Sequence, residues 1–60
     1  MHDFSISPFP EGWSVFEDGE LVAEFAARTA AAAAVAAMRV DLAAAGVRST
    51  VVTEKLPRAL

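Results

Sequence analysis

The sequence predicts an α+β fold: a three-stranded antiparallel meander, one alanine-rich helix packed on one face of it, and a final strand. Two observations carry this prediction. Residues 26–45 contain twelve alanines among twenty residues, and alanine is the strongest helix former. The stretches on either side of this block alternate apolar and polar residues or are rich in Val and Thr, as strands are. We therefore expect the element order strand, strand, strand, helix, strand.

The first two strands are predicted over residues 4–7 and 13–17. Apolar and polar side chains alternate in residues 4–7, which is typical of a short strand with one buried face. Pro8 and Pro10 should end this strand, because proline lacks the N–H that a sheet ladder uses.

A hairpin is predicted between the second and third strands. Asp18-Gly19 is a strong signal for a two-residue turn between antiparallel strands. Residues 20–25 then alternate strictly, which predicts an antiparallel sheet with one face in water. The apolar face of this third strand would carry Leu21, Ala23 and Phe25.

The helix is predicted over residues 30–45. Thr29 is the expected N-cap, because its hydroxyl can accept a hydrogen bond from a free backbone N–H of the first turn. Gly46 fits the left-handed position that ends many helices. One stripe of the helix collects all of its large apolar side chains except Val40 and should cover the sheet. This stripe consists of Ala31, Ala34, Val35, Met38, Leu42 and Ala45.

Residues 47–54 are predicted as the last strand. The order of the elements makes it run parallel to the first and third strands. It can join the open side of the first strand through a right-handed crossover, or it can pair with another subunit. The sequence leaves both alternatives open.

The rear of the predicted helix is apolar, although no strand of this chain would cover it. Small residues there form a shallow groove suited to a second helix packing back to back. Alternatively, the alanines reflect helix propensity alone. The rear groove consists of Ala33, Ala37, Val40 and Ala44.

Two aromatic residues of the second strand complete the candidate interface. Trp13 and Phe16 lie on opposite faces of the strand, because successive side chains alternate. One of them should belong to the core. The other should be half exposed and pack against Phe9 or against a partner.

The chain length of 60 residues allows one small domain, residues 1–60, with an ordered core over about residues 4–55. A chain this short has a marginal core and normally gains stability from disulfides, a metal or a partner subunit. Cysteine is absent and His2 is the single histidine. We therefore expect the chain to gain the additional stability by self-association as a homodimer.

Charge and hydropathy bear on the possible partners of the protein and on its location. The net charge of −3 and the scattered basic residues argue against a nucleic-acid partner. The alanine block does not predict a membrane span, since Arg39 and Asp41 would be costly near the centre of a bilayer. The N-terminus lacks the pattern of a secretory signal. The expected location is the cytoplasm.

No residue cluster predicts catalysis, a cofactor or a metal. The glycines are isolated at turns, so there is no glycine-rich phosphate loop. His2 lies at a terminus that we expect to be mobile, which excludes it from a Ser-His-acid set and from a structural zinc site. The carboxylates around the hairpin are expected to be a solvated surface. We predict that the protein is not an enzyme and uses no cofactor.

Several short motifs follow one another along the chain: Ile6-Ser7-Pro8, Gly12-Trp13-Ser14-Val15, Asp18-Gly19, Phe25 and Thr29 with the alanines after it. In this order they resemble a family of small uncharacterised bacterial domains with the same sequence of elements. A Gly-Trp-x-Val strand, an acidic residue followed by Gly at the turn, and a Thr-capped alanine-rich helix recur in that family. More distantly, the chain is similar to the acidic HicB-like antitoxins of the HicAB type, which share the order of elements.

The sequence thus predicts a non-enzymatic interaction module that self-associates and binds another protein. A second hypothesis is an antitoxin-like or phage-encoded inhibitor of a host protein, acting through the acidic hairpin from Glu17 to Glu24. A third is weak binding of single-stranded nucleic acid, with Trp13 or Phe16 as a stacking platform.

Overall fold

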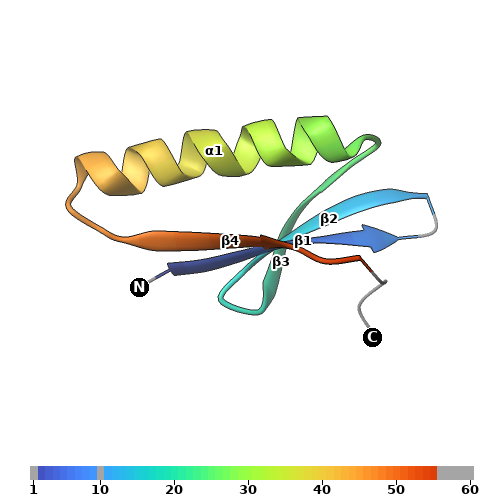
Figure 1. Ribbon diagram of the computed structural model, residues 1–60, viewed down its shortest axis with the longest axis horizontal. Coiled ribbons are helices and arrows are strands. Elements are labelled where there is room, and N and C mark those ends of the chain that lie inside the picture. The colour runs from blue at the N-terminus through green and yellow to red at the C-terminus, as the bar shows by residue number, and fades with distance from the viewer. Residues whose placement is uncertain (1, 10, 56–60) are drawn as a thin grey trace.

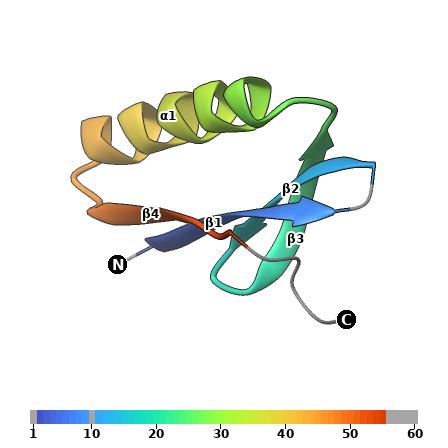
Figure 2. The same cartoon turned by 45° about the vertical axis from the view of Figure 1, so that its right-hand side comes forward.

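The computed structural model describes residues 2–9 and 11–55. The elements follow in the order β1 (His2–Phe9), β2 (Gly12–Glu17), β3 (Glu20–Phe25), α1 (Arg28–Ala44) and β4 (Ser49–Thr53). The four strands form one sheet in the order β3-β2-β1-β4, and α1 lies across one face of it (Figures 1 and 2). The predicted α+β class and the predicted order of the elements are confirmed.

The sheet is mixed rather than purely antiparallel. β1 pairs antiparallel with β2, and β2 pairs antiparallel with β3. β4 pairs parallel with β1, from His2 opposite Ser49 to Ile6 opposite Thr53. Of the two alternatives that the sequence left open, the structure therefore has the last strand on the open side of the first. The strand is shorter than the predicted residues 47–54 because Val47 takes part in the end of α1.

β1 is longer than predicted, and Pro8 does not end it. The His2 N–H donates to Arg48 O (3.0 Å) and the Glu54 N–H donates to Ile6 O (2.8 Å), so the even-numbered residues of β1 direct their backbone polar groups toward β4. The last β1 residue paired with β4 is Ile6. β4 does not extend alongside Pro8, so the N–H that proline lacks would have had no partner in the ladder, and its absence costs no hydrogen bond between strands. Pro10 lies outside the described residues.

The β2–β3 hairpin turns at Asp18 and Gly19, as predicted. Both residues have positive φ, 52° and 86°, as a type I′ turn requires. The strict alternation predicted for β3 is wrong, because Val15 pairs with Ala23 while Phe16 pairs with Leu21. Val22 is the extra residue of a β-bulge, which places Leu21 and Ala23 on different faces.

α1 begins earlier than predicted, and Thr29 is not its N-cap. The N-cap is Ala27, which has extended backbone angles and no side-chain cap hydrogen bond. Alanine favours helix strongly enough that the first turn extends back to Arg28, and Thr29 lies inside it. The end of α1 is as predicted. Gly46 has a φ of 80°, its N–H donates to Ala43 O (3.0 Å), and the Val47 N–H donates to Leu42 O (2.8 Å), which is a Schellman motif.

The core lies between α1 and the two central strands. Buried side chains from β1, β2 and α1 form it, and half-buried apolar side chains pack around them. The buried residues are Phe4, Ile6, Val15, Ala31 and Val35; the half-buried ones are Trp13, Ala23, Phe25, Met38 and Leu42. The predicted helix stripe thus covers the sheet, except that Ala45 is exposed beyond the last helical residue.

The other face of the sheet has a small apolar layer of its own. The rings of Phe9 and Phe16 stack with centroids 6.5 Å apart. Ser7 and Ser14 are buried on the same face, and the Ser7 hydroxyl donates to a Glu54 carboxylate oxygen. Within the described residues, no helix is long and apolar enough to cross a bilayer.

Gly12 is the position where β2 and β3 approach too closely for a side chain. A Cβ added there would lie 2.4 Å from Phe25 O. Gly12→Ala should therefore push the strands apart beside the Trp13–Phe25 pair and destabilise the fold by about 1–3 kcal/mol, measured by urea unfolding. Gly19→Asn is the control, since its Cβ meets no atom within 4 Å and Asn accepts positive φ. Equal unfolding midpoints for both variants would contradict this account.

Candidate interaction surface

Among the residues that the structure describes, the outer edge of β4 is one of two sheet edges without a neighbouring strand. β4 lies last in the strand order, so only one of its edges pairs with β1. The Arg48 carbonyl and the Glu54 N–H bond to β1, which directs the even-numbered residues of this strand inward. Ser49, Val51 and Thr53 therefore direct their N–H and C=O groups outward. An edge of this kind is a template for pairing with another strand.

Apolar side chains flank this edge on both faces of the sheet. Val52 is 60% exposed and Val51 is 37% exposed. Val51 lies on the face covered by α1, opposite Phe4, and Val52 lies on the other face. Val40 of α1 is 67% exposed. The two most exposed valines of the described residues, Val40 and Val52, thus lie on α1 and on β4, whereas Val22 of β3 is more exposed than Val51.

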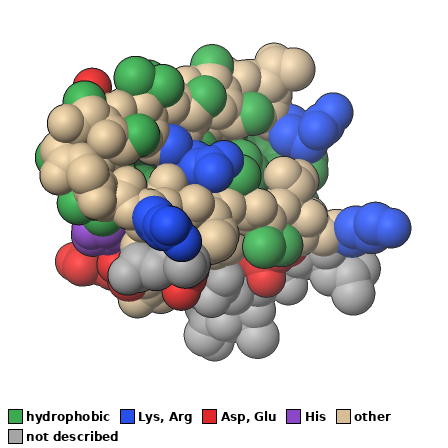
Figure 3. Space-filling view, turned by 60° about the vertical axis from the view of Figure 1, so that its left-hand side comes forward, with side chains coloured by type: hydrophobic (Ala, Val, Ile, Leu, Met, Phe, Trp, Pro, Cys, Tyr) green, Lys and Arg blue, Asp and Glu red, His purple; other side chains and the backbone are tan. Residues whose placement is uncertain are grey.

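A hollow lies between α1 and the start of β4, and we refer to it as the α1–β4 hollow. Its floor is apolar, and two arginines stand at its sides. Figure 3 shows Lys and Arg side chains between the helix and the strand layer on this side of the molecule. The hollow is lined by Ala36, Val40, Ala43 and Val47, with Arg39 and Arg48.

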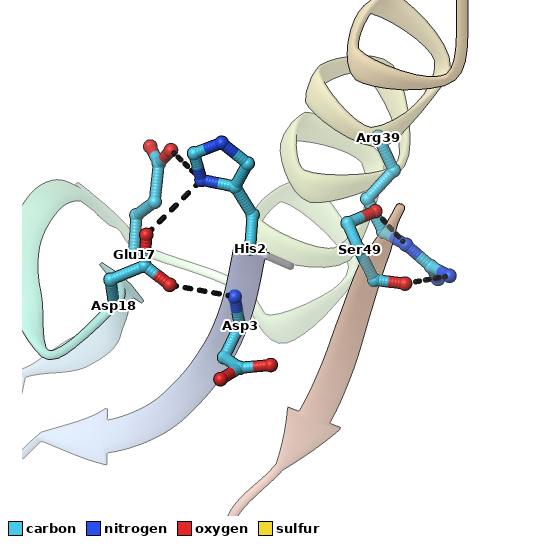
Figure 4. Close-up of polar contacts among 6 residues, drawn as sticks. All are labelled: His2, Asp3, Glu17, Asp18, Arg39 and Ser49. Atoms are coloured by element: carbon cyan, nitrogen blue, oxygen red, sulfur yellow. Dashed lines mark hydrogen bonds and ion pairs between the residues drawn. The ribbon is translucent and has the colours of Figure 1, made fainter. Parts of the chain in front are cut away.

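Arg39 joins the helix to the edge strand. Its Nε donates to Ser49 Oγ (3.0 Å) and its Nη2 donates to Ser49 O (3.1 Å), as Figure 4 shows. The second contact confirms that the Ser49 carbonyl points away from β1. Arg39 therefore covers the first outward carbonyl of β4. Within the described residues, no hydrogen bond reaches the outward groups of Val51 and Thr53.

A second polar cluster ties the start of β1 to the hairpin. His2 Nδ1 lies 3.1 Å from Glu17 Oε2 and 3.1 Å from Asp18 Oδ2 (Figure 4). The Asp3 N–H donates to Asp18 Oδ1 (2.8 Å), and the Asp18 N–H donates to Asp3 O (2.8 Å). The Thr50 hydroxyl in turn donates to Asp3 Oδ1 (2.8 Å), so the cluster reaches from β2 across β1 to β4.

The hydrogen bonds of this cluster lower the pKa of Asp18. The backbone N–H of Asp3 is the largest cause, because it stabilises the ionised carboxylate, and His2 adds to the effect. Among the described residues, only His2, Glu17 and Asp18 converge enough to hold a metal ion, with ligand atoms within 4.8 Å of one another. Imidazole nitrogen and carboxylate oxygen are ligands of zinc. The mutual contacts of the three side chains account for their arrangement without a cation.

The candidate interface residues from the sequence fall in three places. The four residues of the rear groove (Ala33, Ala37, Val40 and Ala44) are all exposed on α1. Trp13 is half-buried at the margin of the core. Phe16 is only 5% exposed and stacks on Phe9 on the other face of the sheet, so the predicted split of the two aromatics between opposite faces is confirmed. The expectation that the residue packed against Phe9 would be half exposed is wrong, because Phe16 is buried there and Trp13 is the half-buried one.

Sequence reasoning missed the two polar contacts that define the surface. His2 was expected in a mobile terminus, but it belongs to β1 and contacts two carboxylates. Extending β1 back by the hairpin register would have placed His2 near Glu17, since Phe4 is opposite Glu17. No sequence signal indicates the Arg39–Ser49 contact, because it depends on β4 lying beside β1.

The lowered pKa of Asp18 predicts an acid-sensitive contribution to stability. The ionised carboxylate stabilises the fold above the ordinary Asp pKa of about 3.9, and this contribution is lost as the pH falls through the lower folded-state value. Asp18→Asn keeps a residue that tolerates positive φ but removes the charge. We expect lower stability at neutral pH and a smaller loss on acidification below about pH 4 than in the wild type. Urea unfolding over a pH series measures both, with Glu24→Gln as control; an unchanged acid dependence in Asp18→Asn would refute the assignment.

Comparison with known proteins adds nothing to the geometry. No family model, no curated protein and no solved structure matches the chain. The resemblances to small bacterial domains and to HicB-like antitoxins stay predictions.

Proposed function

We propose that this chain is a non-enzymatic interaction module that self-associates and binds another protein. The observation that carries the proposal is the outer edge of β4, where outward backbone groups lie between the exposed Val51 and Val52 and beside Val40. Unpaired edges with apolar flanks are surfaces that proteins use for association. A closed two-fold dimer uses the same surface of both subunits, and this edge is present on every copy of the chain.

The small core supports self-association. Only six apolar side chains are buried in the described residues. A subunit interface would remove further apolar surface from water, at about 25 cal/mol for each Å².

The absence of catalysis stays part of the proposal and rests on residue types. The chain has no cysteine, and its one histidine is held between two carboxylates rather than beside a hydroxyl nucleophile. Phe16, which the sequence offered as a stacking platform for nucleic acid, has its ring covered by Phe9. This arrangement weighs against the nucleic-acid hypothesis.

The acidic hairpin supports a second surface, for a different protein. Glu20 and Glu24 are exposed on β3, and the same free edge exposes Leu21 and Val22. A basic partner would find both charge and apolar contact there. An antitoxin-like or phage-encoded inhibitor would use this edge, which is the opposite edge of the sheet from β4.

Self-association is tested by sedimentation equilibrium in the micromolar range. We expect the wild type to be a dimer, and we expect Val40→Lys to shift it toward monomer because a desolvated ammonium would lie in the contact. Val22→Lys is the matched control, since it introduces the same charge at an exposed valine on the other edge. Circular dichroism should show an unchanged fold for both variants.

Two outcomes would contradict the proposal. A wild type that stays monomeric at high micromolar concentration excludes self-association. A dimer that Val22→Lys weakens and Val40→Lys does not would place the contact on the β3 edge instead.

A further inference from the structure

We propose that two copies of this chain pair antiparallel through their β4 edges, about a two-fold axis at Val51, to form one continuous eight-stranded sheet. This inference rests on the proposed self-association and specifies its geometry. The eight strands are twice the four of a single copy. Both helices would lie on the same face of the joined sheet, because the axis runs perpendicular to it.

The outward backbone groups of β4 determine which residues can pair. Antiparallel partners exchange hydrogen bonds only between residues whose N–H and C=O point toward each other. On β4 these are Ser49, Val51 and Thr53, as the inward bonds of Arg48 and Glu54 to β1 require. Pairing must therefore join odd-numbered residues of one copy to odd-numbered residues of the other.

One register uses all of these groups. When Val51 faces Val51 of the second copy, Ser49 faces Thr53 at both ends, and no outward group of the strand is left without a partner. A shift by two residues in either direction leaves one end of each strand unpaired. The Ser49 carbonyl, which already accepts from Arg39, has a second lone pair for the N–H of Thr53.

The same register is complementary in charge and in shape. It places Arg48, which also borders the α1–β4 hollow, opposite Glu54 of the second copy, and the pair occurs twice by symmetry. Val52 lies opposite Thr50 on the face that α1 does not cover, and Val51 lies opposite Val51 on the helix-covered face. Cross-strand pairs of opposite charge and of β-branched residues both stabilise antiparallel sheets.

Pairing through the two different edges is less favourable. β4 against β3 of another copy would be a head-to-tail contact, which does not close after two copies and continues into a ring or a filament. The bulge at Val22 also interrupts the regular ladder on the β3 edge. The β4–β4 contact closes after two copies, and it brings the two α1–β4 hollows beside each other, with Val40 between them.

A single introduced cysteine tests the register, because the chain has no other thiol. Hydrogen-bonded antiparallel pairs have Cα atoms about 5.5 Å apart, within the range of a disulfide. Val51→Cys should therefore form a covalent dimer under mild oxidation, seen on a non-reducing gel. Val52→Cys is the matched control, because Val52 is more exposed than Val51. Position 52 of the second copy would lie diagonally across the paired strands, at a distance of about 7–8 Å, so this variant should cross-link far more slowly.

The two cysteine variants separate this inference from the proposed function. Faster cross-linking of Val52→Cys than of Val51→Cys overturns the register. A wild type that sediments as a dimer while neither variant cross-links overturns the β4 contact and leaves self-association standing, for instance through the rear groove of α1. A monomeric wild type overturns both.

Charge at position 48 provides an independent test. Arg48→Glu would place like charges opposite each other at both ends of the paired strands, and we expect the dimer dissociation constant to rise roughly ten-fold. Arg28→Glu makes the same change of charge at the start of α1, away from β4, and should leave the dissociation constant unchanged. Equal effects of the two substitutions would mean that net charge rather than the Arg48–Glu54 pair controls association.

Discussion

α1 is held to the sheet by a narrow contact in which small side chains let the helix backbone come close. Ala31 and Val35 are completely buried, and they pack on apolar side chains of β1 and β2, the two central strands. Because alanine fills little volume, the buried layer is thin and its stabilisation comes from a few side chains. The position of α1 over the central strands in turn leaves the valines of β4 and the outer flank of the helix in water.

In the proposed dimer, β4 is the strand on which association depends. Its inner edge is fixed by hydrogen bonds at both ends of the β1 pairing, and Arg39 holds its first outward carbonyl from above. The rest of the outer edge presents backbone groups between Val51 and Val52. A strand that is hydrogen-bonded along one edge and open along the other is a preorganised template. Binding of a partner would therefore cost this chain little conformational entropy.

Charged side chains form two distinct groups in the molecule. His2 and Asp18 join the start of β1 to the acidic hairpin. Arg39 and Arg48 line the hollow beside β4, and the carboxylate of Glu54 accepts a hydrogen bond from Ser7 at the other end of that strand. The β4 edge therefore carries both signs of charge, as the proposed pairing of two copies requires, whereas the hairpin is acidic.

Features that depend on single residues or on short periodicity follow from the amino-acid sequence alone. Asp18-Gly19 turns the hairpin because both accept positive φ, Gly46 ends α1 for the same reason, and the spacing of Val35 and Leu42 places them on the sheet. Contacts between distant segments fix the other features. Pro8 fits inside β1 only because the pairing of β1 with β4 ends at Ile6, and β4 could have paired within the chain or outside it. Backbone hydrogen bonding between distant strands depends on which strand lies alongside, and no local pattern of side chains encodes that.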